Sequence, residues 1–328
     1  MTTENFEEIE KYARAFLKKL QENPGEPIYK LSPDKARAVL SGLQANSPVQ
    51  KPPTDVETRT VTNGPKSEEV SITIVRPQNS GKEVLPVVIY IHGGGWVLGG
   101  FDTHERLVRE IANKANIAIV FVNYTLSPEA KYPVALEQAY AATRWVAQNG
   151  QSINVDSSRL AVVGDSVGGN LAAALTLLAK ERKGPSIKFH VLFYPVTDAN
   201  FETPSYIKYE QGYWLTREAM KWFWNNYTSN QTNRTEPTVS PLQASIEQLK
   251  GLPPALIING EHDVLRDEGE AYALKLLEAD VPVTAVRYHG TIHDFVMLNA
   301  ITNDPAPRGA IEQASHMLKM VMNPNNQK

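Results

Sequence analysis

Short apolar runs alternate with longer mixed stretches along most of the chain from residue 87 onward. Each run holds four to six residues, and neighbouring runs are more than ten residues apart. Continuous apolar runs of this length are typical of strands buried on both faces, and the spacing leaves room for a helix between them. We therefore predict an α/β fold with a mostly parallel central sheet flanked by helices. The predicted strands are residues 87–91, 117–122, 160–163, 189–193, 255–258 and 283–288.

The chain before residue 87 follows other patterns. Apolar side chains recur at steps of three and four over residues 6–20, which predicts an amphipathic helix, and residues 33–42 predict a second one. Residues 56–62 and 70–75 are rich in β-forming side chains, and the second run alternates apolar with polar positions. The Asn-Gly-Pro at 63–65 predicts a turn between them. We therefore expect an antiparallel pair of strands at the start of the sheet.

Aromatic residues concentrate between positions 201 and 230, where the alternation of strands and helices is interrupted. Two interpretations stay open for this interval: a hydrophobic helix pair packed on the core, or a lid whose inner wall contacts an apolar substrate. We predict a catalytic domain over 51–328, an N-terminal helical cap segment over 1–50 and a second cap segment over 201–232. The aromatic residues are Phe201, Tyr206, Tyr209, Tyr213, Trp214, Trp222, Phe223, Trp224 and Tyr227.

Acidic and basic residues nearly balance, since 36 Asp and Glu against 33 Lys and Arg leave a formal net charge of −3. Such a chain lacks the positive field that attracts nucleic acid or anionic lipid, so we expect neither partner. The absence of cysteine excludes disulfides and thiolate metal sites. No apolar run approaches the roughly 18 residues that cross a bilayer, and the first twenty residues do not resemble a signal peptide. We expect a cytoplasmic protein with no membrane span.

A serine stands where a predicted strand meets a predicted helix. The strand 160–163 leads directly into Gly164-Asp165-Ser166-Val167-Gly168, a G-x-S-x-G sequence, and a helix is predicted over 171–183. In a nucleophile elbow the glycines allow close approach of neighbouring backbones, and the turn presents the serine hydroxyl outward. The N-terminus of the following helix favours negative charge at the same place. This context indicates that Ser166 is a nucleophile.

A glycine-rich loop follows the strand 87–91. It reads His92-Gly-Gly-Gly-Trp96, the arrangement expected for a loop that completes an oxyanion hole. When a serine attacks an acyl carbonyl, the oxygen becomes an anion that needs backbone donors already in place. We assign these donors to the amides of Gly94, Gly95 and Val167. His92 precedes the glycines and is expected to brace the loop by hydrogen bonding.

Two further strand ends supply a candidate acid and base. Asp263 lies just beyond the strand 255–258, and His293 lies just beyond the strand 283–288. Ser166, Asp263 and His293 therefore follow the chain order Ser, Asp, His of the α/β-hydrolase triad. His289 stays open as an alternative base, and Asp198 as an alternative acid. The remaining histidines suit a structural role better: His104, His190, His262 and His316.

Taken together, the motifs at 92–96 and 164–169 resemble those of the hormone-sensitive-lipase family, bacterial family IV, of α/β-hydrolase esterases. Similar stretches extend the resemblance over residues 56–298. It implies the α/β-hydrolase fold with a helical cap, hydrolysis of short- to medium-chain acyl esters, and often a homodimer, for which 283–288 offers an edge strand. Thr125, Ser127, Val167 and Asp294 depart from the family's usual residues. We expect Val167 to alter the width of the acyl pocket and Asp294 to perturb the loop of His293.

The predicted function is that of a carboxylic ester hydrolase that forms an acyl-enzyme on Ser166. No zinc-binding or nucleotide-binding motif is evident, so we expect no metal and no cofactor, with a small ester and water as the reactants. A neutral His293 is required for attack, which predicts activity that falls below about pH 6. Two alternatives stay open. One is a binding protein on the same scaffold, as in the gibberellin receptors, which lack the catalytic histidine; the other is amidase or acyltransferase activity.

Overall fold

The computed structural model describes residues 6–62, 69–228 and 230–323. Within these residues, one eight-stranded sheet has the strand order β1-β2-β4-β3-β5-β6-β7-β8. β1 pairs antiparallel with β2 and β2 with β4, whereas all the other neighbours are parallel. The predicted parallel sheet and its antiparallel opening are confirmed, and the predicted turn at 63–65 lies outside the described residues. The strands are β1 Thr54–Val61, β2 Val70–Pro77, β3 Leu85–Ile91, β4 Ala118–Asn123, β5 Val155–Asp165, β6 Phe189–Phe193, β7 Ala255–His262 and β8 Val283–Ile292.

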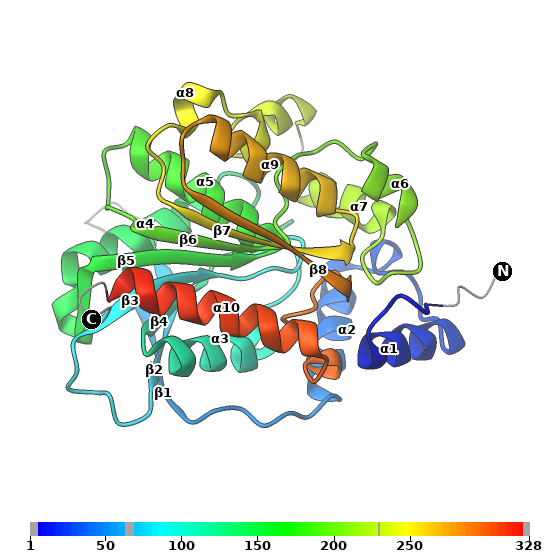
Figure 1. Cartoon of the computed structure of the whole chain (residues 1–328), viewed down its shortest axis with the longest axis horizontal. Helices are drawn as coiled ribbons and strands as arrows, with labels where there is room; N and C mark the ends of the chain where they lie inside the picture. The colour runs from blue at the N-terminus through cyan, green and yellow to red at the C-terminus, as the bar shows by residue number, and fades with distance from the viewer. Residues whose placement is uncertain (1–5, 63–68, 229, 324–328) are drawn as a thin grey trace.

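Helices cover both faces of the sheet. Helices α3 and α10 pack against each other on one face, while α5 and α9 cover the other, with α4 beside α5 (Figure 1). The α-helices are α1 Lys11–Glu22, α2 Pro33–Ala45, α3 Phe101–Ala115, α4 Val134–Asn149, α5 Val167–Glu181, α6 Pro204–Lys208, α7 Arg217–Tyr227, α8 Ile246–Leu249, α9 Arg266–Glu278 and α10 Pro305–Met322. None of the helices in the described ranges is both long and apolar enough to span a bilayer.

The burial of the central strands explains why their sequences are apolar at every position and do not alternate with polar residues. Every residue of β3 and of β6 is buried, because helices pack on both faces of these strands. The edge strand β8 behaves differently, since its side chains alternate between half-buried and exposed along much of its length. Parallel strands also end at one common edge, so the loops that follow β3, β5, β7 and β8 can meet there.

The N-terminal segment is anchored at this edge by polar contacts. The carboxylate of Asp304, just before α10, accepts from the backbone amides of Tyr12 and Ala13 at 2.9 and 2.8 Å, which satisfies free N–H groups of the first turn of α1. Arg37 on α2 donates to the carbonyl of Val97 at 2.8 Å and forms an ion pair with Glu129 at 2.6 Å. In Figure 1, α1 and α2 lie on the side toward which the arrows of β7 and β8 point.

The aromatic interval contains α6 and α7, which lie near the same edge of the sheet (Figure 1). Trp224 and Tyr227 on α7 are fully buried against Trp96, whose ring stacks on Tyr227 at a centroid distance of 4.1 Å. Trp214 and Phe223 instead line a cavity. The interval therefore combines core packing with a cavity wall, and the two cap segments stay a prediction.

Candidate active site

Ser166 occupies the turn between β5 and α5. Its backbone has φ +55° and ψ −120°, a region that residues other than glycine rarely adopt, so the turn is held by its surroundings. Gly164 and Gly168 make this turn possible because each allows another part of the backbone to approach where a side chain would collide with it. A Cβ atom on Gly164 would lie 2.1 Å from the carbonyl oxygen of Gly168, and one on Gly168 would lie 2.0 Å from the carbonyl oxygen of Ile91. The positive φ belongs to the serine itself, as a strand-to-helix elbow requires.

The structure brings the three predicted chemical groups together. The Nε2 atom of His293 lies 3.0 Å from the Oγ atom of Ser166, and its Nδ1 atom lies 2.7 Å from Oδ2 of Asp263. The other carboxylate oxygen of Asp263 accepts from the backbone amide of Leu265 at 2.9 Å. With Nδ1–H donating to Asp263, Nε2 is left to accept the serine proton. This is the arrangement that a serine nucleophile and its general base need.

Burial and neighbouring carboxylates act in opposite directions on His293. Burial of the imidazole lowers its pKa, but the negative charges of Asp263 and then Asp294 raise it more, so the pKa of His293 rises from 6.5 to about 9. The ring of Tyr194 packs edge-on against the imidazole at a centroid distance of 4.8 Å. His293 therefore becomes a stronger base than a histidine in water.

Asp165 and His104 form a second buried pair beside the nucleophile. Oδ2 of Asp165 lies 3.2 Å from Nε2 of His104, and Oδ1 accepts from the hydroxyl of Tyr90 at 2.8 Å and from the amide of Gly93 at 3.1 Å. Burial raises the pKa of Asp165, but His104, the hydroxyl of Tyr90 and His92 together lower it more. This network joins the elbow to the glycine-rich loop. Sequence reasoning missed it, although the carboxylate directly before the nucleophile was a visible signal.

The glycine-rich loop reaches the same cavity as the serine. Gly94 and Gly95 have φ values of +105° and +65°, and both line this cavity together with Ser166 and His293. The amide of Gly93 is engaged by Asp165, so it cannot face an oxyanion. Val167 is the first residue of α5, directly after the nucleophile. The amides of Gly94, Gly95 and Val167 stay our proposed oxyanion donors.

We expect Gly94→Ala to lower kcat about 10²- to 10³-fold with the fold retained, the loss that follows removal of one oxyanion donor. An added Cβ would lie 2.4 Å from the carbonyl oxygen of Leu98, and φ +105° disfavours any side chain, so the loop must shift. Ester hydrolysis and thermal melting measure the two effects. Gly42→Ala on α2 is the control, because its Cβ would meet no atom within 4 Å. A kcat within a factor of about three of the parent would contradict the proposed role of this loop.

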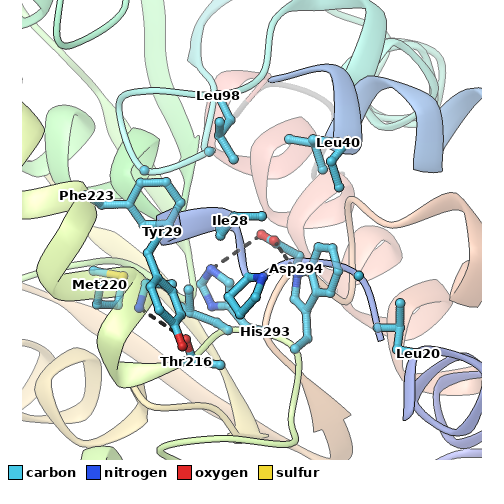
Figure 2. A pocket seen from close by; sticks show the side chains of 18 of the residues that line it. Leu20, Ile28, Tyr29, Leu40, Leu98, Thr216, Met220, Phe223, His293 and Asp294 are labelled. Atoms are coloured by element: carbon cyan, nitrogen blue, oxygen red, sulfur yellow. Dashed lines mark hydrogen bonds and ion pairs between the residues drawn. The ribbon is translucent and has the colours of Figure 1, made fainter. Parts of the chain in front are cut away.

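The cavity in front of Ser166 holds about 590 Å³ and is walled by two separate parts of the chain. Figure 2 shows side chains from both parts facing His293 and Asp294. Most of the lining is apolar or aromatic, which suits the hydrocarbon part of an organic substrate. The N-terminal segment contributes Leu17, Leu20, Ile28, Tyr29, Val39 and Leu40, and the segment between α6 and the end of α7 contributes Trp214, Leu215, Thr216, Ala219, Met220 and Phe223.

The alternative base His289 and the alternative acid Asp198 make contacts with residues outside the group Ser166, His293 and Asp263. His289 is 79% exposed, and its Nδ1 lies 2.9 Å from Glu261. Asp198 accepts from the side chain of Gln243 at 2.9 Å and from the backbone amide of Ala199. His92 braces its loop as expected, with Nδ1 lying 2.7 Å from the carbonyl oxygen of Gly93. The geometry therefore favours His293 and Asp263.

The other histidines also have structural surroundings. His190 is fully buried on β6, and burial lowers its pKa to about 4. The ring of His262 packs against the rings of Tyr209 and Tyr213, which also contact each other. His316 is exposed on α10. Among the described residues, no group of three or more His, Asp or Glu side chains could hold a metal ion.

Known proteins share the sequence and the fold. A family model described as alpha/beta hydrolase fold matches residues 88–297. The chain is 36% identical to an ethyl acetate hydrolase of Pseudomonas putida, over 75% of this chain and 74% of that protein. It is 39% identical to carboxylesterase NlhH of Mycobacterium tuberculosis, over 66% of this chain and 68% of that protein. The crystal structure of a thermostable esterase from Pseudomonas putida superposes with a TM-score of 0.94 at 50% identity, covering 96% of this chain and 98% of that one.

Proposed function

This chain belongs to the α/β-hydrolase fold family, of the hormone-sensitive-lipase type, and is a carboxylesterase; we propose that it cleaves short- to medium-chain acyl esters through an acyl-enzyme on Ser166. The observation that carries the proposal is the continuous hydrogen-bonded chain from Ser166 through His293 to Asp263, at 3.0 and 2.7 Å. It faces a cavity that Gly94 and Gly95 also line. A pure binding protein has no need of this arrangement.

The proposed reaction passes one proton back and forth. His293 Nε2 takes the proton of Ser166 as Oγ bonds to the acyl carbon, and the carbonyl oxygen becomes an anion held by the amides of Gly94, Gly95 and Val167. Asp263 stabilises the imidazolium through its hydrogen bond to Nδ1. The imidazolium then gives the proton to the departing alcohol, which leaves the acyl group on Ser166. Water repeats the same steps, with His293 as its base, and releases the acid.

The cavity supports the proposed substrate class. Its volume of about 590 Å³ and its mostly apolar lining suit a small ester with an apolar acyl group. We expect kcat/KM for p-nitrophenyl esters to peak at acyl chains of about two to six carbons and to fall steeply beyond about ten. Rates across an acyl series from acetate to palmitate test this. A maximum beyond about ten carbons would contradict the substrate class and favour a lipase, and absence of hydrolysis of every ester would remove the proposed activity.

The pH dependence of activity should follow His293. The imidazole must be neutral to accept the serine proton, and its raised pKa means that it stays protonated to a higher pH than an ordinary histidine. We therefore expect kcat/KM to fall on acidification with a midpoint above 6.5, higher than the fall below about pH 6 predicted from sequence alone. A pH profile of a non-ionising ester, corrected for spontaneous hydrolysis, measures this midpoint. Activity that stays flat down to about pH 4 would exclude His293 as the base.

Assembly and location remain predictions. Strand β8 lies at the edge of the sheet, as the sequence predicted, so its outer backbone groups could pair with a second copy across a two-fold axis. We propose a homodimer of this kind and a cytoplasmic location. Light scattering of the purified protein, compared with that of a variant carrying Ala285→Pro on β8, would test the dimer.

A further inference from the structure

Asp294 stands in an unusual backbone conformation beside the proposed base. Its φ is +63°, in the left-handed region that side chains other than those of Asn and Asp rarely adopt. The following loop depends on this residue, because its carbonyl oxygen accepts from the amides of Met297 and Leu298, both at 2.9 Å. Because aspartate tolerates this region, the backbone can hold the carboxylate in a fixed place between His293 and the following loop. The contacts of the carboxylate itself decide whether it has a chemical role.

The carboxylate of Asp294 is mostly buried, and only one of its two oxygens accepts a hydrogen bond among the described residues. Its side chain is 14% exposed, and Oδ2 accepts from the indole N–H of Trp214 at 2.9 Å. Oδ1 lies 3.4 Å from Nε2 of His293 and has no hydrogen-bond partner among the described residues. Figure 2 shows Asp294 next to His293 at the wall of the cavity. A negative charge thus lies a few ångströms from the atom that receives the serine proton.

The surroundings screen this charge poorly. Asp294 lines the same cavity as Ser166, and the remaining wall is mainly apolar, with Glu26 as its other acidic side chain. Burial raises the pKa of Asp294 above its usual value, although His293 and the hydrogen bond from Trp214 act to lower it. The other charged or titratable groups that act on it are Asp165, which raises its pKa, and His104, which lowers it, and these two lie 3.2 Å apart in their own pair. Whenever His293 is neutral, as attack by Ser166 requires, a substrate in the cavity therefore meets the negative charge of Asp294 close to the scissile bond.

We propose that Asp294 makes the site select esters by charge, favouring cationic over neutral substrates and neutral over anionic ones. The inference rests on the proposed ester hydrolysis at Ser166 and adds the class of substrate that reaches it. Asp294 acts on the substrate through its field and needs no direct contact. A merely structural Asp294 would instead alter the hydrolysis of all esters by the same factor.

Three aryl acetates with a common acyl group test the proposal: 3-acetoxy-N,N,N-trimethylanilinium, 3-acetoxybenzamide and 3-acetoxybenzoate. We expect the parent to rank them in that order of kcat/KM. Asp294→Asn removes the charge and keeps the shape and the tolerance of positive φ, so the ratio of the cationic to the anionic substrate should fall about ten- to a hundredfold. The change should persist at high salt, because a buried charge is screened little. The acid limb of the pH profile should also move to lower pH, because His293 loses one of the charges that raise its pKa.

Matched controls separate the possible outcomes. Asp280→Asn changes an exposed aspartate that also has positive φ, +58°, in the turn before β8, and it should leave the ratio unchanged. Asp294→Gly, which suits positive φ without a side chain, repeats the test if the Asn variant is unstable. Equal rate changes for all three acetates in both Asp294 variants would overturn charge selection. Failure of the parent to hydrolyse even the neutral acetate would instead overturn the proposed function.

Discussion

Ser166→Ala should lower kcat for p-nitrophenyl esters by about 10⁶-fold, the largest effect that we expect of any single substitution. The variant loses the only atom that can form the acyl-enzyme, while the neighbouring groups stay in place. Its melting temperature should remain within about 2 °C of the parent, because alanine keeps the Cβ atom and adopts the same backbone conformation at the same cost. Ser166→Gly should be equally inactive but more stable by about 1 kcal/mol, since glycine tolerates φ +55°.

Covalent labelling gives an independent measurement of the same residue. A serine-reactive organophosphate should modify the parent at one site per chain and leave Ser166→Ala unlabelled. Ser152→Ala, which removes an exposed hydroxyl just before β5, at the end of that strand opposite the elbow, is the matched control and should behave as the parent does. Near-normal hydrolysis by Ser166→Ala would end the proposed mechanism.

Asp263→Asn should lower kcat by about 10⁴-fold with little loss of stability. The amide of Leu265 donates to Oδ1 of Asp263 at 2.9 Å and should hold the amide oxygen of the new Asn in that place. The NH₂ group of the Asn then faces Nδ1 of His293 and donates to it. This forces the ring proton onto Nε2, the tautomer that cannot accept a proton from Ser166. The expected loss of kcat therefore comes from reversing the direction of the hydrogen bond between residue 263 and Nδ1 of His293, while the side chain at 263 keeps its shape.

The alternative acid provides the control for this variant. Asp198→Asn makes the same chemical change in a side chain that accepts from Gln243, and it should retain activity within a factor of about three. Steady-state kinetics of the two variants at the pH of maximal activity compare them directly. If Asp198→Asn were the damaged variant and Asp263→Asn the active one, the acid would be misassigned.

Local sequence patterns predicted most of the strands and helices of this protein. The apolar runs identified the six later strands, because a strand buried on both faces must be apolar at every position. Helix ends were predicted less well: α1 begins at Lys11, not at Phe6, since residues 6–9 form a turn whose Phe6 and Ile9 are buried without being helical. Apolar spacing records burial, and it does not distinguish a helix from a buried turn beside it.

The close approaches around the elbow were also visible in the sequence. Gly164 and Gly168 are needed where backbones approach closely: Gly164 because of Gly168, four positions on, and Gly168 because of Ile91 on the neighbouring strand β3. By contrast, the choice between His289 and His293 depended on which side chain leaves the edge strand toward the cavity. Both residues follow the same run in sequence, yet one is 79% exposed and the other is buried.

The sequence by itself determined the sheet, the elbow and the order of the reactive residues, because each depends on neighbours within a few positions of the chain. Only the tertiary structure decided which groups share the cavity. It brought His293 to Ser166 across 127 positions, placed Tyr29 and Phe223 in the lining of one cavity, and turned Asp294 toward the base. Such contacts arise from the paths of loops and the packing of side chains between distant elements, and local hydrophobic patterns carry no record of them.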